Sequence, residues 1–241
     1  MAGPPDSRDA LPRRRWGGFA LGMRLSLPIL LPLGLFGAAF GTVAAQKGLG
    51  LAEAVAMTAF VFAGASQFVA VEMWIHPLTI SAVASIVLVT ATVNMRFMLM
   101  SASLRPWLSD APPWQRYPAL FLMTDPGWLI GLRYRAEGGS DPAVFLGAGV
   151  AQWLIWVAAA IPGYLVGAEL SDPARYGLDL IMPTFFAAML VPLWRGARRA
   201  LPWVVAGVAA LVVAQLFEGW WFIIAGALAG SITAGLERGD V

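Results

Sequence analysis

The segment LTISAVASIVLVTATVNMRFMLMSASL, residues 78–104, is apolar almost throughout, yet near its middle it carries Asn94-Met95-Arg96. It is longer than the roughly 20 apolar residues that an α-helix needs to cross the hydrocarbon core of a membrane. A charged side chain at the centre of a bilayer costs on the order of 3 kcal/mol on insertion scales. Arg96 therefore indicates a partner, a cavity or a substrate inside the membrane.

The composition of the whole chain indicates a membrane protein. Of its 241 residues, 59% are hydrophobic and only 12% are charged, whereas about a quarter of the residues of a soluble domain are charged. The formal charge of +2 is small and gathers on no basic face, so we expect no nucleic-acid partner. The chain has no cysteine, and His76 is its only histidine. These counts exclude thiolate chemistry and a histidine metal cluster, so we also expect no cofactor.

The apolar stretches predict a chain that crosses the membrane many times. Candidate spans lie near 22–45, 54–75, 78–103, 117–134, 143–167, 177–194, 201–217 and 219–236. The last two are short and are joined only by Phe217-Glu218-Gly219, which also suits a tight helical hairpin. We therefore predict an all-α integral membrane protein with seven or eight transmembrane helices, an internal structural repeat and some broken helices.

The remaining residues form tails and short loops. We expect residues 1–20 to be a disordered basic tail, 21–236 a single polytopic transmembrane domain and 237–241 a short C-terminal tail. Arg13-Arg14-Arg15 before an apolar run also fits a signal peptide, but the run is too long for one. The arginines of the short loops favour a cytoplasmic N-terminus.

Small residues recur four positions apart in several spans and predict close helix packing. The pairs are Gly37/Gly41, Gly127/Gly131, Gly163/Gly167 and Gly226/Gly230. A fainter pattern suggests the internal repeat: Gly50-Leu51 and Gly177-Leu178 both follow a short polar loop, and 57–63 is similar in kind to 182–188. Such repeats are common among membrane transport proteins.

Two polar clusters stand out before the middle of the chain. Ser66 and Gln67, within Phe62–Phe68, supply buried hydrogen-bonding groups that either bridge two helices or line a site. Arginine presents a fixed fork of donors that suits a carboxylate, so Arg96 is a candidate anion-binding group. Asn94 points to a different helix face unless the helix is unwound there. The alternatives for Arg96 are a structural ion pair and snorkelling to the interface.

The third cluster is Thr124-Asp125-Pro126-Gly127, deep within an apolar stretch. Pro126 removes an amide donor and disfavours helical geometry at Asp125, which predicts a broken span. Broken spans expose backbone groups that bind ions or substrate where they line a cavity. Asp125 is then a counterpart for Arg96 or a proton carrier, and a purely structural ion pair is the alternative. Gln152 is interpreted as a lone packing residue.

At these clusters the chain resembles the AzlC family, the large subunit of bacterial branched-chain amino acid exporters. The resemblance covers roughly 22–235 and rests on several short motifs in the same order. They are Pro28-Ile29 to Gly41, Gly48 to Glu53, Phe62 to Phe68, Asn94-x-Arg96 with Ala102-Ser103-Leu104, and Thr124-Asp125. One departure concerns Pro126, because relatives usually carry a glutamate after Thr-Asp.

The resemblance implies a multi-pass permease of the bacterial inner membrane that acts with a small AzlD-type membrane subunit. It implies proton-coupled export of valine, leucine, isoleucine and sometimes methionine, with no enzymatic activity. We expect the amino acid to contact Arg96, Asn94, Ser66, Gln67, Thr124 and Asp125, with Asp125 as the proton-coupling candidate. The alternatives are transport of another small solute, which the missing glutamate would suit, and a non-transporting membrane partner subunit.

Overall fold

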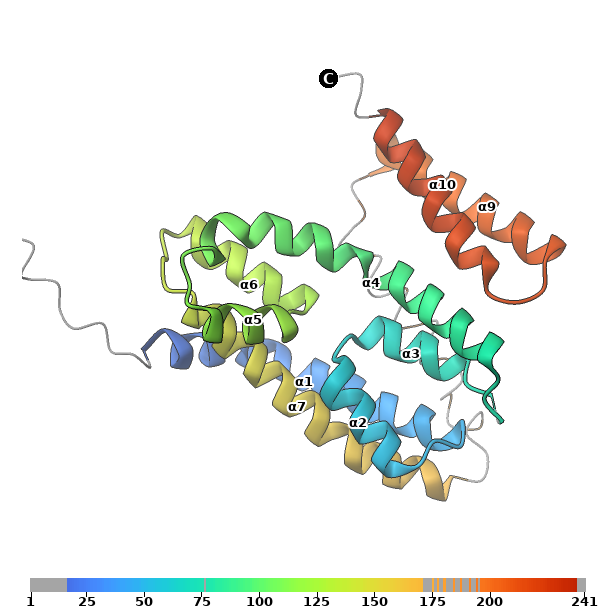
Figure 1. The fold of residues 1–241 in the computed structure, drawn as a ribbon, viewed down its shortest axis with the longest axis horizontal. Coiled ribbons are helices and arrows are strands. Elements are labelled where there is room, and N and C mark those ends of the chain that lie inside the picture. The colour runs from blue at the N-terminus through green and yellow to red at the C-terminus, as the bar shows by residue number, and fades with distance from the viewer. Residues whose placement is uncertain are drawn as a thin grey trace, which may run out of the picture. The chain divides into compact units, whose positions relative to one another are not determined.

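The computed structural model describes residues 17–75, 77–170 and 196–237, with a few single positions between 175 and 194. Every regular element in this part of the chain is a helix, which confirms the predicted all-α class (Figure 1). Among the described residues, three helices are long and apolar enough to cross a membrane: α1 (Gly17–Gln46), α4 (Ile80–Leu108) and α7 (Ala143–Glu169). Even the shortest of them is about 40 Å long at 1.5 Å per residue, which exceeds the hydrocarbon thickness of about 30 Å.

Two of the predicted spans are each divided into two shorter helices. The stretch near 54–75 forms α2 (Leu51–Val61) and α3 (Gly64–Glu72), a break that no proline marks in the sequence. The stretch near 117–134 forms α5 (Pro113–Phe121) and α6 (Asp125–Ala136), so the predicted break is present. The predicted non-helical backbone at Asp125 is wrong, because the break lies before Asp125 and Pro126 is in the first turn of α6. None of the four is as long as the roughly 20 residues that a spanning helix needs.

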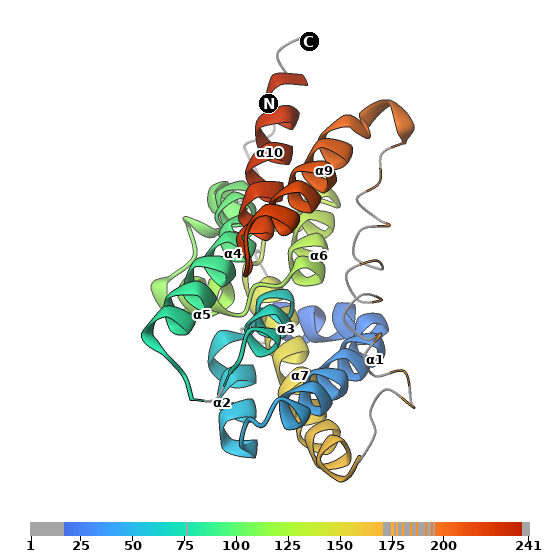
Figure 2. The same cartoon turned by 90° about the vertical axis from the view of Figure 1, so that its right-hand side faces the viewer.

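The C-terminal part forms the predicted helical hairpin. A short 3₁₀ turn, η4 (Ala197–Arg199), leads into α9 (Leu201–Leu216), and α10 (Trp221–Glu237) returns along it (Figure 2). The turn between them uses Gly219 at φ 94°, a backbone conformation that favours glycine. The predicted span at 177–194 and the second copy of the predicted repeat lie largely outside the described residues, so seven or eight spans stays a prediction.

The chain divides into two compact units. The first unit contains the described residues up to Gly37 together with Phe97–Ala159. The second contains Ala38–Arg96 and the described residues from Ala160 onward. Helices α1, α4 and α7 contribute residues to both units.

Helices α1 and α7 pack backbone against backbone within each unit. In the first unit, a Cβ atom added to Gly22 would lie 1.9 Å from the Val144 carbonyl oxygen. In the second unit, one added to Gly163 would lie 2.0 Å from the Ala38 carbonyl oxygen. Only glycine permits so close an approach, which confirms the close packing that the small residues predict.

The other predicted small-residue pairs also lie at close contacts. Gly131 of α6 faces Phe145 and Trp107. Gly226 and Gly230 of α10 both face Ala206 of α9.

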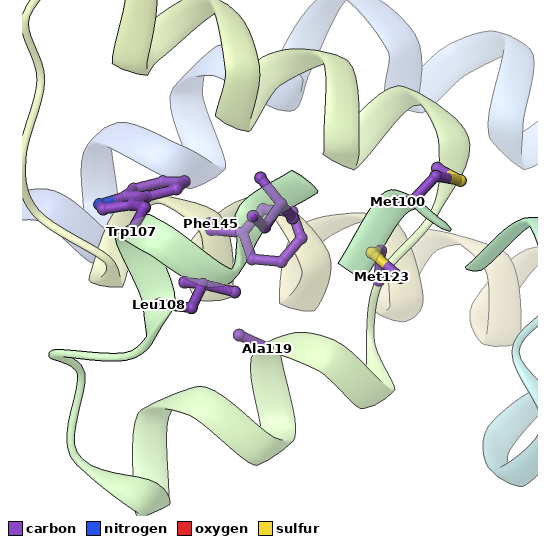
Figure 3. Packing of buried hydrophobic residues seen from close by; sticks show 7 residues of the cluster. Met100, Trp107, Leu108, Ala119, Met123 and Phe145 are labelled. Atoms are coloured by element: carbon purple, nitrogen blue, oxygen red, sulfur yellow. The ribbon is translucent and has the colours of Figure 1, made fainter. Parts of the chain in front are cut away.

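The apolar core of the first unit joins α4, α5, α6 and α7. It is built from Met100, Leu104, Trp107, Leu108, Ala119, Met123 and Phe145 (Figure 3). The Trp107 indole donates from Nε1 to the Ser140 carbonyl oxygen at 3.1 Å, which satisfies its polar edge. Met123 belongs to this cluster and lies between α5 and α6, so the break itself is anchored to the core.

We expect Gly163→Ala to destabilise the protein. The added methyl group would collide with the Ala38 backbone, and α1 would have to move away from α7. Overpacking costs about 1–3 kcal/mol, and a rigid backbone neighbour favours the upper end of that range. Thermal unfolding in detergent, followed by tryptophan fluorescence, measures the loss. Gly207→Ala in α9 is the matched control, because its Cβ atom would have no neighbour within 4 Å; equal unfolding midpoints for the two variants would contradict the prediction.

Candidate functional site

The break between α5 and α6 presents Asp125 at a capped helix start. Thr124 has an extended backbone, φ −127° and ψ 164°, and its hydroxyl oxygen accepts the Gly127 amide proton at 3.0 Å. The break therefore lies just ahead of Asp125, which is itself helical. Pro126 fits in the first turn, because its missing amide proton would have no helical partner there. The Asp125 carboxylate lies where the helix dipole stabilises negative charge.

A line of hydrogen bonds runs from this half-buried helix start to α7 and α1. The Thr124 hydroxyl donates to Oε1 of Gln152. Nε2 of Gln152 donates to the Ser26 hydroxyl oxygen at 3.4 Å. The Ser26 hydroxyl in turn faces the carbonyl oxygens of Gly22 at 3.2 Å and Ala148 at 3.4 Å. Ser26 and Gln152 are fully buried, so the bonds of Ser26 lie away from water, whereas Thr124 is half-buried.

Two of these residues were not assigned to the site from the sequence. Gln152 is not the lone packing residue that the sequence suggests, since both ends of its amide are hydrogen-bonded. A lone amide in an apolar helix was the available signal, because such a group needs partners. Ser26 carried no signal of its own within its apolar span.

A glycine of α7 allows the end of α5 to approach that helix closely. A Cβ atom added to Gly149 would lie 2.9 Å from both Cβ and the carbonyl oxygen of Leu122. Gly149 and Gln152 are three residues apart and therefore share one face of α7. This face both accommodates the end of α5 and hydrogen-bonds to the start of α6.

The break between α2 and α3, in the second unit, contains two local hydrogen bonds from side chains to carbonyl groups. Nε2 of Gln67, in the first turn of α3, donates to the Met57 carbonyl oxygen of α2 at 2.9 Å. The Ser66 hydroxyl donates to the Ala63 carbonyl oxygen at 2.9 Å. Both side chains are fully buried. Ser66 and Gln67 therefore each donate a hydrogen bond to a carbonyl group in or next to the preceding helix.

Phe62 forms the bend itself and is strained. Its φ of 22° makes it the one residue other than glycine with positive φ in the described part of the chain. A bulky residue in that region costs energy that the surrounding contacts must offset. Beyond α3, Nζ of Lys47 pairs with Glu72 at 2.6 Å and ties the end of α1 to the end of α3.

Arg96 and Asn94 lie on an unbroken helix. Because α4 runs without interruption from Ile80 to Leu108, the two side chains leave it in directions about 200° apart. The unwound alternative is therefore excluded. Nη1 of Arg96 lies 3.4 Å from the Val93 carbonyl oxygen, one turn back along the same helix. Oδ1 of Asn94 is buried and has no hydrogen-bond partner within the described residues.

The predicted site residues fall into two groups, one in each unit. The structure brings Thr124 and Asp125 together with Gln152 and Ser26 in the first unit. It places Ser66 and Gln67 at one break, and Asn94 and Arg96 on one helix, in the second unit. Pairing of Arg96 with Asp125 stays a prediction. In the part of the chain that the structure describes, no group of three or more His, Asp or Glu residues is placed to hold a metal ion.

Comparison with known proteins gives a consistent result. Residues 28–170 match the model of a family described as AzlC protein. A membrane protein of Helicobacter pylori is 26% identical over 202 residues, which cover 83% of this chain and 86% of the relative. One of Archaeoglobus fulgidus is 26% identical over 223 residues, covering 91% and 95%. Both are named as uncharacterized membrane proteins, and no solved structure matches. Both helix breaks and Arg96 lie within the matched residues.

We expect Thr124→Val to loosen the start of α6, because it removes both the cap and the donor to Gln152. Losing an N-cap costs about 0.5–2 kcal/mol, and the Gln152 carbonyl is left without that donor. Thr124→Ser should retain most of the stability. Thr92→Val is the control, since the Thr92 hydroxyl bonds only to Leu88 of its own helix. Unfolding midpoints in detergent test the order; a Thr124→Val midpoint equal to that of Thr92→Val would refute the capping role.

Proposed function

Because this chain belongs to the AzlC family, we propose that it is the large subunit of a two-component secondary transporter that exports branched-chain amino acids. Valine, leucine, isoleucine and methionine are the proposed solutes, and the proton gradient is the proposed driving force. The proposed location is the bacterial inner membrane, with a cytoplasmic N-terminus. The proposal includes seven or eight spans in one permease domain and no enzymatic activity.

The observation that carries the proposal is the presence of two helix breaks inside apolar segments. Non-helical backbone at membrane depth is tolerated where protein or a water-filled cavity surrounds it. Broken helices of this kind form the substrate and ion sites of many secondary transporters, because their ends present backbone dipoles. Each break here is accompanied by buried polar side chains, which a purely structural membrane anchor would not need.

The chemistry of the candidate residues suits a small zwitterion. An amino acid needs donors for its carboxylate, acceptors for its ammonium group and an apolar surface for its side chain. The Arg96 guanidinium is the proposed group that binds the solute carboxylate. Asp125 is the proposed ammonium acceptor or proton carrier. Gln67 can serve an ammonium group only through its oxygen, because its nitrogen is a donor that already bonds to Met57.

A small AzlD-type membrane subunit is the proposed partner. We expect cells that express both chains, loaded with dipeptides of valine, leucine, isoleucine or methionine, to release the free amino acid faster than cells with neither chain. Cells with this chain alone should show little of the increase. Equal release from all strains would reject these solutes, and the same assay with other small amino acids would then test the alternative that Pro126 suggests.

We expect Arg96→Lys to reduce export at least about 10-fold if the guanidinium binds the carboxylate. Lysine keeps the charge but loses the bidentate fork, and one such contact is worth about 1.5–3 kcal/mol. The measurement is the initial efflux rate at matched amounts of protein in the membrane. Arg133→Lys is the control, because Arg133 is exposed in an ion pair with Glu137. Normal export by Arg96→Lys would show that the fork does not bind substrate.

A further inference from the structure

We propose that Gln152 is a positioning residue for Asp125, and that Ser26 supports it from α1. The proposal rests on the proposed transport function for its effect on export, but the positioning itself is a property of the described contacts. Gln152 lies in α7 and does not belong to the candidate substrate contacts. Its influence passes through the Thr124 hydroxyl to the first turn of α6.

The direction of each hydrogen bond is determined by the groups involved. The Gly127 amide can only donate, so the Thr124 oxygen must accept from it at 3.0 Å. The single Thr124 proton then goes to Oε1 of Gln152, which can only accept. This orients the Gln152 amide so that its nitrogen donates to Ser26. The Ser26 proton is therefore directed to backbone carbonyls of α1 or α7.

This ordered line restricts the Thr124 side chain to the rotamer that caps α6. Asp125 follows Thr124 directly and is the first residue of that helix. Whatever holds Thr124 therefore holds the backbone from which the Asp125 carboxylate projects. Replacement of Gln152 removes the acceptor of the Thr124 hydroxyl proton, and the rotamer of Thr124 that caps α6 is then less favoured.

The local packing leaves little freedom for a replacement arrangement. A Cβ atom added to Gly127 would lie 2.9 Å from Oγ1 of Thr124 and 3.3 Å from Nε2 of Gln152. The two polar side chains therefore fill the space beside the first turn of α6. Gly149 presses against Leu122 from the same face of α7. A shift of Gln152 is consequently transmitted to both sides of the break.

The chain itself offers a matched control for Ser26. The Thr42 hydroxyl, on the same helix, bonds to the carbonyl oxygen four residues back, Ala38, at 3.1 Å. It also bonds to the α7 carbonyl oxygen of Gly163 at 2.9 Å. Ser26 bonds in the same way to the carbonyl oxygens of Gly22 and Ala148. Unlike Thr42, Ser26 also accepts a hydrogen bond from Gln152, which in turn bonds to Thr124. Ser26→Ala and Thr42→Val therefore remove equivalent helix-to-helix bonds with different consequences for Asp125.

The first test reads the geometry without any substrate. The chain has no cysteine, so Pro126→Cys introduces a single thiol beside Asp125. We expect Gln152→Met and Ser26→Ala, each in this background, to change the rate of N-ethylmaleimide labelling in membranes by about 2- to 10-fold, as the loss of one or two hydrogen bonds allows. Thr42→Val should leave the rate unchanged. Equal rates in all three would overturn the positioning role.

The second test uses export by the complex of both subunits. Gln152→Met should change the solute concentration for half-maximal export, or shift the pH profile of export, at a normal amount of protein in the membrane. Thr42→Val should change neither. A uniform loss of export that follows protein amount in both variants would overturn the proposal. If the chain exports none of the branched-chain amino acids, the proposed function fails, while the labelling rates still decide whether Gln152 positions the start of α6.

Discussion

The structure depends on one constraint: a backbone amide or carbonyl that leaves a helix inside hydrocarbon must find its partner within the protein. The two breaks meet this constraint in different ways. At the α2–α3 break, Gln67 and Ser66 bond to carbonyl groups of Met57 and Ala63 within ten residues of themselves. At the α5–α6 break, the Gly127 amide likewise bonds within its own segment, to the Thr124 hydroxyl, but that hydroxyl also bonds to Gln152 of α7. The capping side chain of the second break therefore has a partner on another helix.

The close contact of α1 with α7 brings Ser26 to Gln152, which bonds to the capping residue Thr124. Glycines at their contact bring the two backbones near enough for a hydroxyl on one helix to reach a carbonyl on the other, as Ser26 and Thr42 both do. Lipid offers no hydrophobic advantage for helix association, so close packing and hydrogen bonds have to supply it. The same contacts that hold α1 to α7 thus also support the residue that caps α6.

The sequence predicted those features that depend on local chemistry. Apolar length located α1, α4 and α7, and Pro126 revealed the α5–α6 break. The α2–α3 break was missed because it contains no proline and its residues stay apolar; Phe62 adopts positive φ only under tertiary constraint. The partnership of Gln152 with Ser26 joins positions 126 residues apart, so no local pattern contains it. The position of Asp125 was predictable, whereas the contacts that hold it were not.

Arg96 and Asp125 differ in how firmly the fold places them. Arg96 extends from an unbroken helix on a long flexible side chain, and its guanidinium lies near the Val93 carbonyl of the same turn. More rotatable bonds separate the Arg96 guanidinium from its backbone than separate the Asp125 carboxylate from its own. Asp125 has a short side chain on a helix start that the Thr124 cap and the Gln152 contact hold in place. For the proposed transport function, a carboxylate held in this way offers the ammonium group of a solute, or a proton, a defined place at the start of α6.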